Sequence, residues 1–163
     1  MASATGPASA GPTAADDRTH MLTAISLAKS CIPVTTAYNV GAVLLAPSSP
    51  PTVLSTGFSR ELPGNTHAEE CALLKISKND TLHLARGATI YTTMEPCGER
   101  LSGKRTCAER LIEAGVSRVV VGVREPSHFI AECQGTVMLR AAGIDVDYFS
   151  GLEEQCQALN EHI

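Results

Sequence analysis

The sequence predicts an α/β protein, a three-layer α/β/α sandwich around a mixed five-stranded sheet. Three observations support this prediction. Short apolar runs of strand length occur five times, and segments with helical spacing separate most of them. The first two runs are joined by a turn rich in Pro and Ser, which predicts a hairpin. Alternating strands and helices are typical of layered α/β folds, and the hairpin makes part of the sheet antiparallel.

The chain has 163 residues, the length of one ordinary domain. Residues 1–15 are almost entirely Ala, Ser, Gly, Pro and Thr, and we expect a flexible tail because they bury too little apolar surface to offset the entropy of ordering. We expect residues 16–163 to form a single domain. A mitochondrial targeting segment would need arginine, and the first basic residue is Arg18.

The first helix is expected to begin at Asp16 or Asp17, either of which can cap it, and to run to about Cys31. The run VGAVLLA (40–46) predicts a buried strand, and TVLSTG (52–57) its hairpin partner. The later elements are a helix over 67–78, a strand over 88–94, a helix over 107–114, a strand over 117–123, a helix over 131–142, a strand over 144–149 and a helix over 151–161.

Composition favours a small-molecule partner. The formal net charge is −4, whereas proteins that grip nucleic-acid backbones usually carry a basic surface. Aromatic residues make up only 4 % and Trp is absent, so a platform for stacking single-stranded bases is poorly supported. No apolar run approaches the roughly 18 residues of a membrane span. We therefore expect no nucleic-acid partner and no membrane insertion.

Six cysteines are an even number, so a disulfide framework is one interpretation. The chain is longer than typical disulfide-stapled domains and lacks a secretory signal pattern, which favours reduced thiols and a cytoplasmic location. In that setting a Cys near His and acidic residues indicates a metal site or catalysis.

Three short motifs supply such a group: His67-Ala68-Glu69, Pro96-Cys97, and Cys107 after nine intervening residues. Each lies after a strand or turn and near the start of an expected helix, where free N–H groups and the helix dipole favour thiolates. One His and two Cys suit Zn²⁺, one ion per chain, and leave a fourth tetrahedral position for water. Such an open position is typical of a catalytic zinc site.

Glu69 is expected to be the catalytic residue and not a fourth ligand. Residues two apart on a helix point roughly 160° from each other, so a His67 at the helix start leaves the longer Glu side chain to reach the water. A carboxylate there can take the water's proton and return it to a ring nitrogen and then to departing ammonia. Taken alone, a His-x-Glu is common by chance, and Cys97 or Cys107 is more often a small core residue.

His-x-Glu followed by Pro-Cys is the signature of zinc-dependent deaminases, although that pattern has two residues between its cysteines and this chain has nine. Over about residues 17–150 the sequence resembles the cytidine-deaminase superfamily. SRELPGNTHAEECAL (59–73) and TTMEPCGERLSGKRTC (92–107) resemble the fungal riboflavin-biosynthesis deaminase. The resemblance implies a cytidine-deaminase-like fold, a homodimer, and a stand-alone deaminase, since the length leaves no room for a reductase domain.

That resemblance also implies a substrate, 2,5-diamino-6-ribitylamino-4(3H)-pyrimidinone 5′-phosphate, whose 2-amino group would be replaced by oxygen with release of ammonia. The loop GERLSGKRT (98–106) carries Arg100, Lys104 and Arg105 against Glu99, a local balance of +2. Because both ends of the loop are tied to the metal, these cations could pair with a sugar phosphate. The alternative is a solvated surface loop.

Three further residues are candidate substrate contacts. Asn39 precedes the first strand, where the superfamily commonly has an Asn that contacts the ring or sugar, although Asn is also a common turn residue. Arg60 matches a substrate-contacting position of the bacterial relatives, where His is usual. Ala68 is expected to offer its backbone to the pyrimidine edge, as superfamily relatives do.

Two other functions remain open from the sequence. The first is a deaminase with another substrate, such as dCMP, guanine or tRNA. The second is a non-catalytic zinc-stabilised module, which would need a fourth protein ligand or the loss of the Glu. Glu69 is present, and no fourth ligand suggests itself by spacing.

Overall fold

The structure is a computed structural model, and it describes residues 13–129 and 133–163. In chain order the elements are α1 (Ala14–Ala28), β1 (Gly41–Leu45), β2 (Val53–Phe58), α2 (Ala68–Ser77), the short 3₁₀ helix η1 (Leu82–Ala85), β3 (Thr89–Met94), α3 (Cys107–Ala114), β4 (Arg118–Val123), α4 (Gly135–Ala141), β5 (Asp145–Tyr148) and α5 (Glu153–Ala158). All five predicted strands are confirmed, each with bounds within two residues of the expected ones.

The five strands form one mixed sheet in the order β2-β1-β3-β4-β5. β1 pairs antiparallel with both β2 and β3, whereas β3, β4 and β5 run parallel to one another. The parallel half follows from the helices that intervene between its strands, since parallel neighbours need a crossover connection. β1 and β4 are almost wholly buried, as expected for apolar runs in central strands.

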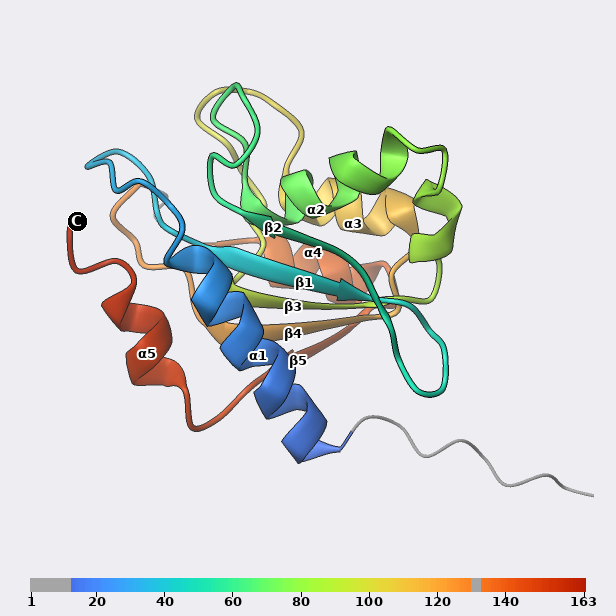
Figure 1. The fold of residues 1–163 in the computed structure, drawn as a ribbon. Coiled ribbons are helices and arrows are strands. Elements are labelled where there is room, and N and C mark those ends of the chain that lie inside the picture. The colour runs from blue at the N-terminus through green and yellow to red at the C-terminus, as the bar shows by residue number, and fades with distance from the viewer. Residues whose placement is uncertain (1–12, 130–132) are drawn as a thin grey trace, which may run out of the picture.

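Helices cover both faces of this sheet. Figure 1 shows α1 and α5 on one side and α2, α3 and α4 on the other, which confirms the three-layer α/β/α sandwich. The two faces of the β1–β2 hairpin each carry a glycine against a helix. A Cβ on Gly41 would lie 1.9 Å from the Ala24 carbonyl oxygen of α1, and one on Gly57 would lie 2.1 Å from the Ala68 carbonyl oxygen of α2. These close approaches seat α1 and α2 directly on the strands.

The start of α1 differs from the expectation. Thr13, and not Asp16 or Asp17, is the N-cap, and Asp16 returns the bond by accepting the Thr13 backbone N–H at 3.0 Å. Ala14 and Ala15, expected in the tail, therefore form the first turn, because a reciprocal capping box satisfies two orphan N–H groups. Residues 1–12 of the expected tail lie outside the described residues.

Several other helix bounds are shorter than expected. α1 ends at Ala28 instead of Cys31, and α5 covers Glu153–Ala158 instead of 151–161. α4 begins at Gly135, and positions 133 and 134 of the expected helix are not helical, while 131 and 132 lie outside the described residues. α3 occupies the expected 107–114 because a Thr106 capping box begins it and Gly115, at φ +74°, ends it.

All six cysteines are free thiols, in agreement with the expected reduced state. Cys31, Cys71 and Cys156 are buried and Cys133 is half-buried. In the part of the chain that the structure describes, no helix combines the length and the hydropathy that crossing a bilayer requires.

Candidate metal centre and active site

Three separate elements bring the expected metal ligands together. His67 is the N-cap of α2, Cys97 follows the end of β3, and Cys107 is the first residue of α3. The His67 Nδ1 atom lies 3.5 Å from the Sγ atoms of both Cys97 and Cys107. Their three ligand atoms lie within 4.8 Å of one another. The fold thus brings together His67 and Cys107, which are 40 positions apart in the sequence.

This geometry fits a tetrahedral Zn²⁺ ion. Bond lengths of about 2.0–2.1 Å to nitrogen and about 2.3 Å to sulfur place two tetrahedral ligands of these types about 3.5 Å apart. The observed 3.5 Å separations agree with that value. The group contains three protein ligands and no fourth among the described residues. Three ligands are the number typical of a catalytic zinc site.

The electrostatics of the two thiols also call for a cation. Hydrogen bonds from Cys107 and His67 lower the pKa of Cys97 to about 4. The Cys107 backbone N–H donates to the Cys97 sulfur at 3.3 Å. The pKa of Cys107 is raised by its hydrogen bond with Cys97, by burial and by Glu69. Beside the Cys97 thiolate and Glu69, Cys107 can also lose its proton only where positive charge is added, and a divalent ion would supply that charge.

Glu69 lies beside these ligands, almost fully buried at 3 % exposure, in the first turn of α2. Its Oε1 accepts a hydrogen bond of 2.9 Å from the Thr92 hydroxyl on β3. Burial raises the pKa of the Glu69 carboxyl above its ordinary value, and the Cys97 charge adds to the effect. A carboxyl with a raised pKa next to a candidate metal site is suited to accept and return a proton.

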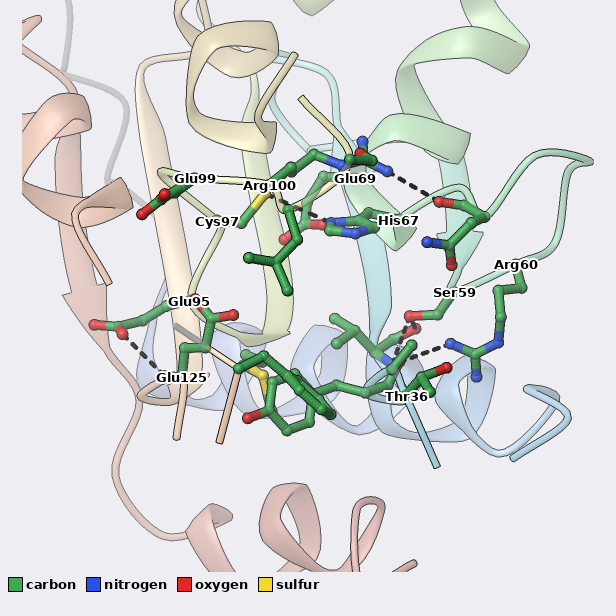
Figure 2. Close-up of a pocket in the computed structure, with 18 residues that line it drawn as sticks. Thr36, Ser59, Arg60, His67, Glu69, Glu95, Cys97, Glu99, Arg100 and Glu125 are labelled. Atoms are coloured by element: carbon green, nitrogen blue, oxygen red, sulfur yellow. Dashed lines mark hydrogen bonds between the residues drawn. The ribbon is translucent and has the colours of Figure 1, made fainter. Parts of the chain in front are cut away.

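His67, Cys97 and Glu69 line a pocket with an empty volume of about 840 Å³, part of it open to solvent. Cys107 is fully buried and is not among the described residues that line the pocket. Figure 2 shows His67, Glu69 and Cys97 grouped on one side, with Glu95 and Glu125 on a second and Ser59 and Arg60 on a third. The pocket therefore has an acidic wall and a basic wall around the metal ligands.

The acidic wall contains a carboxylate that sequence reasoning missed. Glu125 follows β4, and its buried Oε2 has no hydrogen-bond partner among the described residues. Burial raises its pKa. Glu95 holds this position by accepting the Glu125 backbone N–H at 2.9 Å and a hydrogen bond from the Tyr148 hydroxyl. The available signal was a charged residue directly after a central strand, where α/β proteins place ligand-binding groups.

The three expected cations of the 98–106 loop are all engaged within the protein. The Arg100 guanidinium is buried, 2.8 Å from Glu70 Oε2, and also donates to the Asn65 carbonyl at 2.9 Å. Lys104 donates to the Gly64 carbonyl at 2.6 Å, and Arg105 pairs with an exposed carboxylate of α3. Arg100 lines the pocket, whereas Lys104 and Arg105 are not among the described residues that line it.

Glu70 is the centre of a buried ion network that the sequence did not indicate. One carboxylate oxygen accepts from Arg100 and the other from Arg110, each at 2.8 Å. Burial raises the pKa of Glu70, but Arg100, the His67 backbone N–H and Arg110 outweigh burial and hold the pKa below its ordinary value. The network fastens the 98–106 loop and α3 to the start of α2, and so it fixes the positions of the metal ligands.

Asn39 and Arg60 face each other instead of both facing a ligand. Arg60 donates to Asn39 Oδ1 and to the carbonyls of Tyr38, at 3.0 Å, and Ile32, at 3.1 Å. The Asn39 amide donates to the Leu159 carbonyl at 3.2 Å. Arg60 lines the pocket, and Asn39 is not among the described residues that line it.

Ala68 is likewise absent from the described residues that line the pocket. Its side chain is fully buried, and its carbonyl oxygen lies against Gly57 of β2. Among the expected substrate contacts, the structure therefore brings Arg60 and Arg100 to the pocket and leaves Asn39, Ala68, Lys104 and Arg105 outside its lining.

Comparison with known proteins identifies the class to which this fold and site belong. Residues 14–123 match the family described as the cytidine and deoxycytidylate deaminase zinc-binding region. The chain belongs to this family, and the family's zinc-binding character agrees with the geometry at His67, Cys97 and Cys107.

Particular relatives lie within riboflavin biosynthesis. The chain is 42 % identical over 137 residues to a diaminohydroxyphosphoribosylamino-pyrimidine deaminase of Schizosaccharomyces pombe, covering 84 % of this chain and 33 % of that protein. It is 36 % identical over 147 residues to the riboflavin biosynthesis protein RibD of Synechocystis, covering 89 % of this chain and 36 % of that protein. The chain thus spans about a third of the length of these curated relatives.

Solved structures give the same picture. The Aspergillus oryzae Rib2 deaminase, a C-terminal deletion mutant, superposes with a TM-score of 0.80 at 32 % identity, covering 88 % of this chain and 90 % of that one. The same protein in complex with DARIPP gives a TM-score of 0.78. The dCMP deaminase of cyanophage S-TIM5 gives 0.60 at 20 % identity, covering 81 % of this chain and 95 % of that one, and shares the fold.

Proposed function

We propose that this chain is a zinc-dependent deaminase that acts on 2,5-diamino-6-ribitylamino-4(3H)-pyrimidinone 5′-phosphate, replacing the amino group at C2 by oxygen and releasing ammonia. The observation that carries the proposal is the convergence of His67, Cys97 and Cys107 on one point, beside a pocket that His67, Cys97 and the buried Glu69 line. The names of the Schizosaccharomyces relative and of the DARIPP-bound Rib2 deaminase support this substrate class.

In this function Glu69 is the group that moves protons. A zinc ion held by the three ligands would supply a Lewis acid that lowers the pKa of water. The Glu69 carboxylate accepts one proton of the attacking water and delivers it to a ring nitrogen of the pyrimidine as the water oxygen bonds to C2. It then accepts the second proton from the new C2 hydroxyl and delivers it to the amino group, which leaves as ammonia when the C–N bond breaks and the C2 carbonyl forms. Burial of Glu69 supports this role, because it raises the affinity of the carboxylate for the proton that it must carry.

The two polar walls of the pocket suit the two ends of such a substrate. A diaminopyrimidine presents several N–H donors, and Glu125 Oε2 is a buried acceptor without a hydrogen-bond partner among the described residues. We propose that Glu125 accepts a hydrogen bond from the base. Arg60 and Arg100 also line the pocket. Both guanidinium groups are bonded within the protein, and we propose that a substrate phosphate beside them gains a charge-assisted contact. Lys104 and Arg105, on the same 98–106 loop as Arg100, are proposed to add positive charge from outside the lining.

Turnover of defined substrates tests the proposal. We expect the zinc-loaded protein to release ammonia from the ribitylamino-pyrimidinone phosphate, and to do so far faster than from dCMP or CMP. Glu69→Gln should keep the fold and about one zinc per chain but lower kcat by at least about 100-fold, because proton transfer contributes about 10²–10⁴-fold. Ammonia release, zinc content and thermal unfolding are the measurements.

Glu154→Gln is a matched control, because Glu154 is an exposed carboxylate on α5, far along the chain from the ligands. It should keep wild-type turnover. Near-normal kcat in Glu69→Gln would contradict the proton-transfer role. Faster turnover of dCMP, guanine or a tRNA substrate would replace the proposed substrate but keep the deaminase chemistry. Zinc binding without turnover of any of these substrates or of the pyrimidinone phosphate would favour a non-catalytic module.

We also propose a homodimer in a reducing, cytoplasmic compartment. Six free cysteines support the reducing environment. Exposed apolar side chains at Ile32, Leu101 and Val137 are candidates for burial between subunits. Light scattering of the purified protein measures the mass directly, and a monomer at micromolar concentration would contradict the dimer.

A further inference from the structure

A hydroxyl on the central strand lies against the proton-transfer residue. Thr92 is fully buried in β3, and its Oγ1 lies 2.9 Å from Glu69 Oε1 and 2.9 Å from the Met94 carbonyl oxygen. β3 is paired on both sides at this point, with Ala42 of β1 and with Val121 of β4. Thr92 therefore stands at a rigid position of the sheet.

We propose that Thr92 is a positioning residue for Glu69, an inference that rests on the proposed function. By donating to Oε1, Thr92 holds one carboxylate oxygen against the sheet and leaves Oε2 as the oxygen that meets the substrate and the attacking water. Thr92 does not touch the substrate, since it is not among the described residues that line the pocket.

The two side chains differ in stiffness in the way that this role requires. A Glu side chain has three rotatable bonds and loses much rotamer freedom when it is held in one geometry. Thr is branched at Cβ and strongly restricted at χ1, so its hydroxyl has a fixed place once the backbone is fixed. A hydrogen bond from this rigid strand therefore holds the Glu69 carboxylate, at the start of α2, in one position.

Thr92→Val removes the hydroxyl at nearly constant shape, and Thr92→Ser retains it. We expect Thr92→Val to lower kcat by about 10- to 100-fold, the effect of a displacement of about 1 Å in a catalytic group. KM and zinc content should stay within about twofold, because the pocket lining and the ligands are untouched. Thr92→Ser should recover most of the lost kcat.

Thr93→Val is the matched control. Thr93 is the next residue of β3, equally buried, and its hydroxyl accepts the Gly41 backbone N–H at 3.2 Å on the other side of the strand. Its loss should reduce thermal stability with little effect on kcat. Equal kcat in Thr92→Val and wild type would overturn the proposal, and so would an equal loss of kcat in Thr92→Val and Thr93→Val.

Thermal unfolding gives a readout that does not depend on turnover. In a double-mutant cycle with Glu69→Ala, the drop in midpoint caused by Thr92→Val should be at least about 2 °C larger when Glu69 is present, because only then is a buried carboxylate left unpaired. Thr93→Val should be additive with Glu69→Ala. Additivity for Thr92 would refute the contact.

If the wild type turns over no substrate, the proposed function fails, while the double-mutant cycle still decides whether Thr92 contacts Glu69. Should Val not fold at position 92, Thr92→Ala removes the same hydroxyl.

Discussion

At the scale of single residues, the partners of a charge decide what it can do. Arg100 was expected to bind a substrate phosphate, yet its guanidinium is buried and already bonded to Glu70 and to the Asn65 carbonyl. Arg105, five residues later in the same loop, forms a pair in which both side chains are more than half exposed. Two arginines of one loop therefore contribute differently to stability, because burial removes the solvent screening that makes surface ion pairs weak.

We predict that Arg100→Met lowers the free energy of unfolding by about 3 kcal/mol, since it leaves the Glu70 carboxylate buried with one partner fewer. Arg105→Met should change the same quantity by less than about 0.5 kcal/mol. Urea unfolding of both variants measures the difference. If Arg100 served mainly as a phosphate ligand, its variant would instead show a raised KM with wild-type stability.

At the scale of elements, the positions of the helices depend on glycines of the hairpin. Gly57 lets the backbone of α2 lie directly on β2, and Gly41 does the same for α1 on β1. The two sites differ in consequence, because α2 follows the candidate metal ligand His67 and carries Glu69 in its first turn, whereas none of the three candidate ligands lies on α1. A shift of α2 therefore moves the chemistry, and a shift of α1 does not.

We predict that Gly57→Ala and Gly41→Ala each lower the free energy of unfolding by about 1–3 kcal/mol, the usual cost of overpacking. Only Gly57→Ala should also weaken zinc binding, because α2 must move away from β2 to admit the methyl group. Unfolding curves and zinc titration against a chelator separate the two effects. Equal zinc affinity in both variants would contradict this prediction, because it would mean that α2 can move away from β2 without displacing His67 at its N-terminus.

At the scale of the whole molecule, one ion pair ties the N-terminal helix to the far half of the sheet. Asp17 of α1 accepts two hydrogen bonds from Arg118 of β4, at 2.9 and 2.8 Å, and one of 2.7 Å from the hydroxyl of Tyr91 on β3. Burial raises the pKa of Asp17, but the bonds from Arg118 and Tyr91 outweigh burial and leave the pKa below its ordinary value. The cluster joins residues about a hundred positions apart.

A carboxyl whose pKa is lowered by folding stabilises the native state above its unfolded pKa of about 4, and this contribution is lost as the pH falls through the folded value. We predict that Asp17→Asn lowers the free energy of unfolding by about 3 kcal/mol at pH 7, and that the gap to wild type narrows at pH 3. Urea unfolding at both pH values measures the gap. Asp145→Asn, at an exposed position, is the control, and a gap for Asp17→Asn that is constant with pH would contradict the assignment.

The sequence by itself predicted the succession of strands and helices along the chain, the candidate metal ligands His67, Cys97 and Cys107, and the proton-transfer candidate Glu69. Apolar periodicity and short motifs carry that information, because each is encoded within a few adjacent residues. The bounds of α3 agree with the predicted ones, because its N-cap Thr106 and the terminating Gly115 lie directly beside it in the sequence. The start of α1 was not predicted correctly, because Thr13 and Asp16, which form the capping box, lie among other residues that could cap a helix equally well.

Only the tertiary structure decided how the polar side chains are paired. Arg60 meets Asn39 across 21 residues, Thr92 meets Glu69 across 23, and Arg100 meets Glu70 across 30. The burial of Glu125 Oε2, which has no hydrogen-bond partner in the part of the chain that the structure describes, likewise depends on how the segment after β4 packs beside the pocket. Burial and hydrogen-bond partners are properties of the packed chain, and they separate a side chain available to a ligand from one already bound within the protein.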